Sequence, residues 1–227
     1  MGDQSRVFVR KLLIWYKKAA RTLPWRHTRN PYAILVSEFM LQQTQVSRVL
    51  DYFPRFMARF PTIDALARSR PKAVMEQWDG LGYYARARNL HKLARQVTRL
   101  HDGTLPNSPE ELQTLPGVGR YTAGAVACFA YEKAVPAVDT NVRRVLNRVF
   151  GNAKSGMRNA ELWRLASALV PKNGNRAWKF NQAMMELGAL VCTARAPKCQ
   201  DCPVKHHCRY TARLNSRIRN PGRARPR

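Results

Sequence analysis

The chain has 227 residues, of which 45% are hydrophobic, so it can bury the core of one large domain or of two small ones. Its 40 Lys and Arg residues face only 14 Asp and Glu, and the formal charge of +26 favours a polyanionic partner, above all nucleic acid, over a merely basic protein with an arginine-rich tail. We expect no membrane partner, because the sequence holds no apolar run of about 18 residues and no secretion signal at its start.

Helical periodicity runs through most of the chain. It predicts helices over residues 7–20, 32–43, 44–60 with an interruption at Pro54, 62–69, 71–81 and 85–103. Further helices are predicted over residues 108–115, 120–132, 140–151, 161–171 and 177–192. No segment has a convincing strand pattern, and short Gly/Pro loops join the helices, so the predicted fold class is all-α. The arginine-rich segment 209–227 is expected to be flexible.

The stretch LPGVGR, residues 115–120, forms a glycine turn between two predicted helices. Gly117 and Gly119 allow a tight turn whose amides approach an anion, at the favourable end of the following helix. A nucleotide-binding P-loop is excluded, because no strand precedes the turn and Arg120 and Tyr121 stand where it needs Lys and Ser/Thr. The pattern favours a helix-hairpin-helix that grips duplex phosphate without reading sequence, with a monovalent cation on the turn carbonyls. The alternative is an ordinary helix–helix turn with a glycine cap.

Four of the five cysteines lie close together near the C-terminus, with the spacing C-x6-C-x2-C-x5-C: Cys192, Cys199, Cys202 and Cys208. Disulfides are rare inside cells, so we interpret the loop as a metal site. Zinc ribbons usually pair two C-x2-C knuckles, whereas one wrapped loop can supply the four thiolates of a 4Fe–4S cluster. We therefore predict a 4Fe–4S cluster, with zinc as the alternative.

The motifs LPGVGRYTAGA and VDTNVRRVLNRV, together with the cysteine loop, resemble the helix-hairpin-helix DNA glycosylases. Within that group, LPWR, VSEFMLQQTQV, GLGYYARARNLH and FNQAMMELGALVCT resemble the MutY-type adenine DNA glycosylases. The resemblance implies two helical lobes with a DNA-binding cleft between them. Residues 1–28 and 134–208 would form one lobe with the cluster loop at 192–208, and residues 29–133 a six-helix barrel with the hairpin at 109–131. Residues 209–227 would be a basic flexible tail.

The same resemblance assigns the chemistry of breaking the bond between a base and deoxyribose. Asp139 would stabilise the positively charged sugar, although it can also be only the N-cap of the following helix. Glu38, whose apolar neighbours favour a protonated carboxyl, would give its proton to the departing adenine; the alternative is an exposed helix acid. Tyr121 stands where related lyases carry the lysine that forms a Schiff base, which predicts a monofunctional enzyme. Its hydroxyl would bond Asp139 or the sugar, or its ring would only pack under the hairpin, and Asn141 would orient Asp139 or a water.

The target base must leave the stack, and the resemblance names the residues that would help it do so. Gln42, Gln43 and Tyr83 would probe and wedge the duplex, although Tyr83 or Tyr84 is expected to pack in the core. The remaining predicted contacts are with the base pocket or the phosphates: Trp25, Arg26, Gln182, Gly117, Gly119, Arg120 and Arg143.

The resemblance therefore predicts a monomeric, cytoplasmic glycosylase that works with the bacterial or archaeal nucleoid. It would remove adenine opposite 8-oxoguanine or guanine in duplex DNA. Typical relatives carry a further C-terminal domain that helps recognise 8-oxoguanine, and the chain matches the form without it, whether naturally short or truncated. Thr140 departs from the glycine common in adenine enzymes, and thymine or uracil opposite guanine is the alternative substrate. A non-catalytic iron–sulfur DNA-binding protein is the alternative from another class, and direct water attack and a covalent adduct on Asp139 both stay open.

Overall fold

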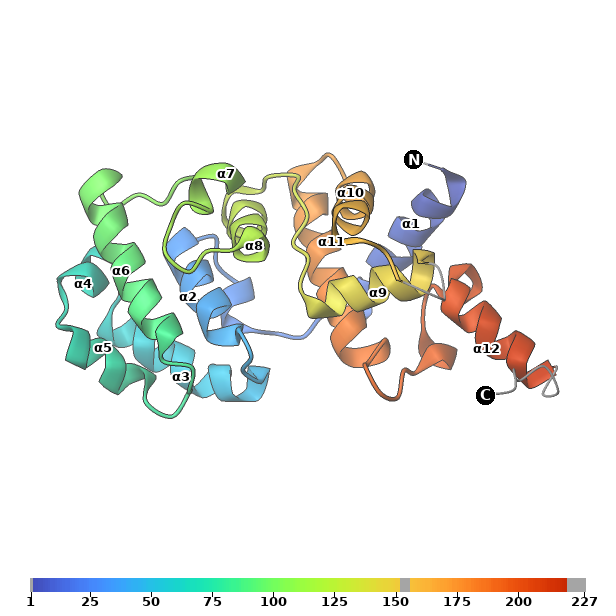
Figure 1. Cartoon of the computed structure of the whole chain (residues 1–227), viewed down its shortest axis with the longest axis horizontal. Coiled ribbons are helices and arrows are strands. Elements are labelled where there is room, and N and C mark those ends of the chain that lie inside the picture. Colours follow the sequence, from blue (N-terminus) through green and yellow to red (C-terminus); the bar gives the residue numbers. More distant parts are fainter. Residues whose placement is uncertain (1, 152–155, 220–227) are drawn as a thin grey trace. The chain divides into compact units, whose positions relative to one another are not determined.

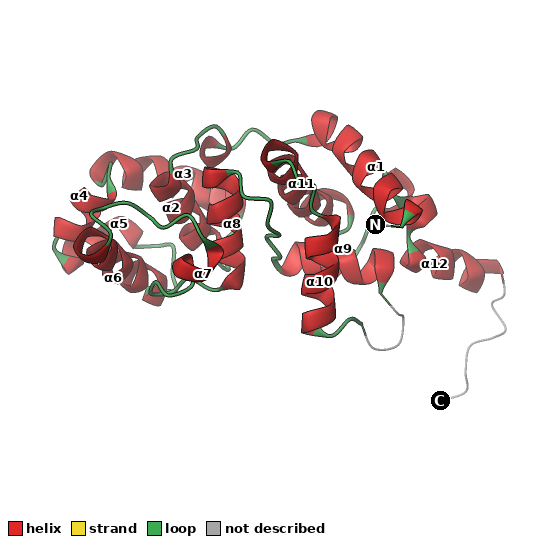
Figure 2. Ribbon diagram, turned by 90° about the horizontal axis from the view of Figure 1, so that it is seen from above, coloured by secondary structure: helices red, strands yellow, loops and turns green. Residues whose placement is uncertain are grey.

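The computed structural model describes residues 2–151 and 156–219, and all regular structure within them is helical (Figures 1 and 2). This confirms the predicted all-α class. The chain forms two compact units, which we call unit 1 (Met1–Arg21 with Ala134–Arg227) and unit 2 (Thr22–Lys133). In the described part of the chain, no helix is long and apolar enough to cross a membrane.

Unit 2 contains seven α-helices and one short 3-10 helix in its described residues. In chain order they are η1 (Pro24–Arg26), α2 (Pro31–Leu41), α3 (Val46–Arg59), α4 (Ile63–Arg68), α5 (Pro71–Trp78), α6 (Ala85–Leu100), α7 (Pro109–Leu112) and α8 (Arg120–Tyr131).

Helix α2 lies at the centre of unit 2. Asn30 caps it by accepting hydrogen bonds from the amides of Tyr32 and Ala33, and Pro31 occupies its first turn. Nine consecutive residues, from Tyr32 to Met40, are buried because α3, α6 and α8 all pack against this helix. A helix that is apolar on every side belongs in a core, so any acid on it is held away from water.

Helix α3 runs without a break from Val46 to Arg59, so the interruption predicted at Pro54 is wrong. Proline inside a helix removes one backbone hydrogen bond, here the bond to the carbonyl of Leu50. Both Leu50 and Pro54 lie on the exposed face, where water can satisfy that carbonyl. The opposite face buries Val49, Phe53 and Phe56, and this packing keeps the helix continuous.

Unit 1 combines the N-terminal helix with the C-terminal part of the chain. Its described elements are α1 (Asp3–Ala19), α9 (Thr140–Phe150), α10 (Asn159–Leu169), α11 (Gly174–Glu186), the π-helical turn η2 (Leu187–Val191), η3 (Cys199–Asp201), η4 (Lys205–His207) and α12 (Arg209–Arg219). Helix α1 packs on α11, and α9 packs on α11 and η2. Arg21, two positions beyond the end of α1, forms a bidentate pair with the fully buried Glu186 and so ties the N-terminal segment to the end of α11.

Two boundaries differ from those expected from the sequence. Unit 2 begins at Thr22 rather than at residue 29, because Trp25 packs edge-on against Phe53 of α3, with ring centroids 5.5 Å apart. The expected flexible tail begins with helix α12, since Arg209 donates to the carbonyl of Phe150 and Arg148 stacks on Tyr210. Residues 220–227 lie outside the described residues.

Candidate active site

In unit 2, Glu38 is buried on α2, with only 4% of its surface exposed. The hydroxyl of Tyr121 on α8 donates a hydrogen bond of 2.7 Å to its Oε2 atom. The alternative of an exposed helix acid is therefore wrong for Glu38. The sequence analysis did not foresee this contact with Glu38, which lies 83 positions away, while a bond from Tyr121 to Asp139 or to the sugar stays a prediction.

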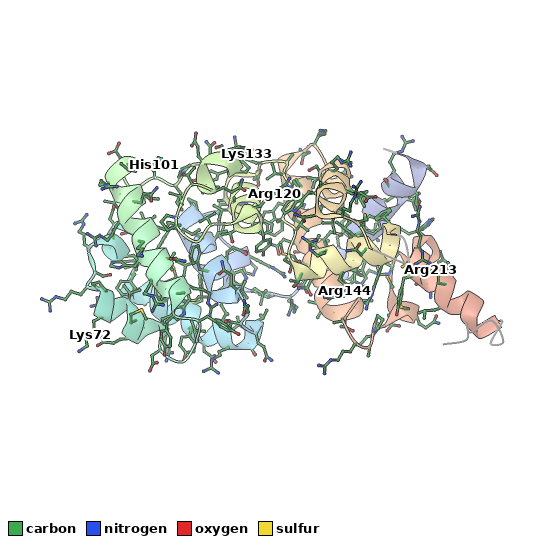
Figure 3. The ribbon with its side chains drawn as sticks, in the orientation of Figure 1. Lys72, His101, Arg120, Lys133, Arg144 and Arg213 are labelled. Carbon is green, nitrogen blue, oxygen red and sulfur yellow. The ribbon has the colours of Figure 1, made fainter. Side chains whose placement is uncertain are left out.

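The glycine turn joins the short helix α7 to α8, as a hairpin requires (Figure 1). Gly117 has a φ of +77°, and a Cβ there would lie 2.8 Å from the Cβ of Asn89 and 3.0 Å from the ring of Phe39, so only glycine fits. Gly119 is extended, and a Cβ there would meet nothing within 4 Å. Packing therefore does not require the second glycine, and its bare backbone leaves room in front of α8. Arg120 is exposed at the start of α8 (Figure 3).

Gln42 and Gln43 follow the end of α2, and Tyr83 precedes α6. Gln43 and Tyr83 both adopt positive φ angles, +54° and +47°, which are strained for residues other than glycine. Tyr83 is 60% exposed, so it does not pack in the core. Its neighbour Tyr84 is also exposed and donates its hydroxyl to Asp79, so the expectation that one of the two packs in the core is wrong. A strained backbone that carries an exposed side chain is typical of functional positions.

The residues predicted to surround the base differ in their exposure. Trp25 is buried against Phe53, so its packing role is clear, while a contact with a base stays a prediction. Arg26 is half-buried in the same 3-10 turn. Gln182 is buried on α11 of unit 1. Arg143 is exposed on α9 and donates to the side chain of Asn159.

In unit 1, Asp139 is the N-cap of α9, and its Oδ1 accepts the amide of Val142 at 2.7 Å. Its other oxygen, Oδ2, accepts the side-chain amide of Asn141 at 2.9 Å, so Asn141 orients this carboxylate as predicted. Burial raises the pKa of Asp139, while these hydrogen bonds and the charge of Arg144 oppose the rise by favouring the ionised form.

Arg144 extends this arrangement, and the sequence analysis missed it. It projects from α9 (Figure 3) and donates to the Oδ1 of Asn141 at 2.8 Å, to the carbonyl of Gly188 at 2.7 Å and to that of Cys192 at 2.8 Å. A Cβ at Gly188 would lie 2.6 Å from the Cβ of Asn141, so glycine lets η2 approach α9 this closely. A continuous set of hydrogen bonds thus joins Asp139 to the first residue of the cysteine loop.

Asn181 holds the segment that leads to Asp139. Its side chain, buried on α11, accepts the amide of Ala137 and donates to the carbonyl of Val135, both at 2.9 Å. The amide group of asparagine supplies both the acceptor and the donor that these two contacts need. The sequence motif FNQA placed Asn181 next to Gln182 but gave no sign of this contact.

Cys192, Cys199, Cys202 and Cys208 line a single cavity with apolar side chains around it. Burial and mutual repulsion raise the pKa of Cys202 to about 11, so four neighbouring thiolates need a strongly positive group between them. The guanidinium of Arg148 donates to the Sγ of Cys192 at 3.4 Å and to three carbonyls of the same loop. This donor set, four thiolates and one flanking cation, fits an iron–sulfur cluster.

Two protein-family models match this chain, one over the segment that contains Glu38, the glycine turn and Asp139, and one over the cysteine loop. The family model described as "HhH-GPD superfamily base excision DNA repair protein" matches residues 36–168. A second model, "Iron-sulfur binding domain of endonuclease III", matches residues 192–208, the span of the four cysteines.

Curated relatives extend the similarity over most of the chain. An adenine DNA glycosylase of Mycolicibacterium smegmatis is 47% identical over 201 residues, covering 88% of this chain and 68% of that protein. One of Rattus norvegicus is 46% identical over 219 residues, covering 91% of this chain. This chain spans only 42% of the rat protein.

Solved structures show the same fold. A thermostable thymine-DNA glycosylase matches with a TM-score of 0.86 at 33% identity, covering 92% of this chain and 97% of that one. Endonuclease III trapped in a covalent complex with DNA matches with a TM-score of 0.80 at 25% identity, covering 95% and 100%. The cysteine loop therefore holds a 4Fe–4S cluster, and the chain belongs to the HhH-GPD superfamily of base excision DNA repair proteins.

Proposed function

We propose that this protein is a monofunctional DNA glycosylase that removes adenine opposite 8-oxoguanine or guanine in duplex DNA and acts as a monomer. The observation that carries this proposal is the buried carboxyl of Glu38, held by the hydroxyl of Tyr121. A buried acid on an apolar helix is suited to donate a proton, and adenine leaves far more easily once it is protonated at N7. The relatives named adenine DNA glycosylase support the choice of base.

In this proposal two carboxyl groups have opposite tasks. Glu38 protonates the departing base, and ionised Asp139 stabilises the cationic sugar that remains. Asn141 and the amide of Val142 hold the Asp139 carboxylate in place while the bond breaks. Tyr121 cannot form an imine with the sugar, so the product is an abasic site rather than a nicked strand.

The proposed DNA contacts come from both units. The amides at the start of α8 and the exposed Arg120 would bind one phosphate group, with a monovalent cation on the turn carbonyls. Arg143 would bind another phosphate from α9. Gln42, Gln43 and the exposed Tyr83 would enter the base stack, which lowers the cost of extruding the target nucleotide.

Thymine or uracil opposite guanine is the second candidate substrate. The structural match to a thermostable thymine-DNA glycosylase, at a TM-score of 0.86, supports it. We favour adenine because the adenine enzymes are more similar in sequence, at 46% and 47% identity against 33%.

Labelled duplexes containing A:8-oxoguanine, A:G, T:G or U:G would be incubated with the protein and then treated with alkali. We expect cleavage at adenine in the first two duplexes and none before alkali treatment. Cleavage at T:G or U:G alone would establish the second candidate, and no cleavage in any duplex would indicate a protein that only binds DNA. Efficient trapping of the protein on DNA by borohydride would contradict the monofunctional mechanism.

A further inference from the structure

Arg86 is a buried cation in the first turn of α6, with 7% of its surface exposed. Burying a guanidinium is costly unless hydrogen bonds satisfy it, and its hydrogen bonds in the described chain go to six backbone carbonyl oxygens. A methionine or leucine would fill the same space without that cost. The position of these carbonyls indicates what the charged group does.

Three of the carbonyls belong to the end of α2. Nη1 of Arg86 donates to Phe39 at 3.0 Å, to Met40 at 2.7 Å and to Gln42. The last carbonyls of a helix lack partners inside the helix and carry partial negative charge, so a cation binds them well. Because the carbonyl of Gln42 belongs to the peptide that links it to Gln43, this contact fixes the backbone immediately before the strained Gln43.

The other three carbonyls belong to the segment before α6. Nη2 donates to Leu81 at 3.3 Å and to Gly82 at 3.0 Å, and Nε donates to Tyr83 at 3.4 Å. The guanidinium also lies 5.3 Å from the ring centroid of Trp78 and 5.5 Å from that of Tyr83. Trp78 donates its own Nε1–H to the carbonyl of Gly82 at 3.2 Å, so this segment is held from two directions.

We propose that Arg86 is a positioning residue that locks the two DNA-probing segments, Gln42–Gln43 and Leu81–Tyr83, in one fixed geometry. This inference rests on the proposed function. The planar guanidinium points donors along several directions at once, which the single ammonium group of lysine cannot do. Both segments would then enter the DNA stack as one rigid wedge, and extrusion of the base would not require ordering them first.

The test compares two substrates under single-turnover conditions. One is a duplex with adenine opposite guanine, where the base must be extruded, and the other carries an unpaired, bulged adenine. We expect Arg86→Lys to lose about 100-fold in excision from the mismatched duplex, because a small misplacement of a positioned group has effects of this size. On the bulged substrate, the loss is expected to stay within about tenfold.

A fluorescent base gives a second measurement that does not depend on excision. 2-Aminopurine placed opposite guanine brightens when it leaves the stack, and we expect Arg86→Lys to lose most of this signal. The matched control is Arg99→Lys, the same substitution at an exposed position in the last turn of α6. It should leave both the rates and the fluorescence unchanged.

Gly82→Ala provides a variant that leaves the buried cation in place. Gly82 has a φ of +72° and open space around it, so a Cβ strains only the backbone of the probing segment. We expect the same selective loss on the mismatched duplex.

Equal losses on both substrates in these variants, accompanied by a lower unfolding temperature, would overturn the proposal and leave Arg86 a purely structural residue. Unchanged rates and fluorescence would also overturn it. If the unaltered protein excised no base at all, the proposed function would fail, and the 2-aminopurine signal alone would decide the role of Arg86.

Discussion

The two candidate catalytic carboxyl groups, one in each unit, are held in contrasting ways. Asp139 begins a helix and accepts hydrogen bonds from a backbone amide and from Asn141, which is in turn held by Arg144. Glu38 lies in the middle of a buried helix and accepts a hydrogen bond from the hydroxyl of Tyr121. Around Asp139, the hydrogen bonds and the charge of Arg144 favour the ionised carboxylate and oppose the rise in pKa that burial causes, whereas Glu38 lies among the buried, largely apolar residues of α2. Each environment thus matches the task that we propose for its acid.

Replacing Glu38 with glutamine is expected to have the largest effect on the rate of excision. The substitution keeps the shape and the contact with Tyr121 but removes the acidic proton. We expect excision of adenine to slow by about 1,000-fold, within the usual range for losing a general acid. Single-turnover rates on the A:G duplex measure this. Glu76→Gln, at an exposed position on α5, is the control and should have no effect. A Glu38→Gln variant that excised adenine at the normal rate would remove Glu38 from the mechanism.

Replacing Asp139 with asparagine tests the other half. Asparagine is as good an N-cap as aspartate, so α9 should keep its stability while the charge is lost. We expect a loss of about 100- to 1,000-fold in excision, typical of removing one electrostatic contact to a charged transition state. Binding to the duplex and the visible absorbance of the cluster should not change. The reciprocal change Asn173→Asp, at the exposed N-cap of α11, is the control. If the variant lost activity only to the extent that its lower unfolding temperature explains, Asp139 would be only a cap.

The hydrogen bond from Asn141 to Asp139 can be tested through the pH dependence of the excision rate. Asp139 must be ionised to act, so the rate falls as the pH drops through its pKa, which burial raises above the ordinary value. Asn141 opposes that rise by bonding the carboxylate, so Asn141→Ala should raise the pKa further and move the acid limb of the rate profile to higher pH. We expect about a tenfold loss near neutral pH, the cost of one hydrogen bond to a charged group. Profiles of Asn141→Ala and of Asn175→Ala, an exposed control on α11, would show it, and an unshifted acid limb would contradict it.

The sequence predicted those parts of the fold and of the site that depend on local pattern. The periodicity of each helix, the glycine turn and the cysteine spacing can each be read from a short stretch of consecutive residues. The bond between Tyr121 and Glu38 joins positions 83 residues apart, and no local pattern reports it. No local pattern reports the roles of Arg86 and Arg144 either, because both side chains bind backbone carbonyls that tertiary packing brings to them. The predicted interruption at Pro54 was wrong for the same reason, because tertiary packing maintains a helix that the local propensity of proline would end.

The cap of α2 gives the smallest expected effect and separates helix stability from catalysis. At Asp139 the capping group and the proposed catalytic group are one side chain, whereas Asn30 caps the helix of Glu38 from eight positions away. Asn30→Ala should cost about 1 kcal/mol of stability. For a chain of this size, that lowers the unfolding temperature by about 2–4 °C. Excision well below that temperature should not change, because packing on α3, α6 and α8 holds Glu38 in place. Ser108→Ala, which removes the side-chain cap of α7, is the matched comparison. A loss of excision in Asn30→Ala without unfolding would show that the cap, and not the core, positions the acid.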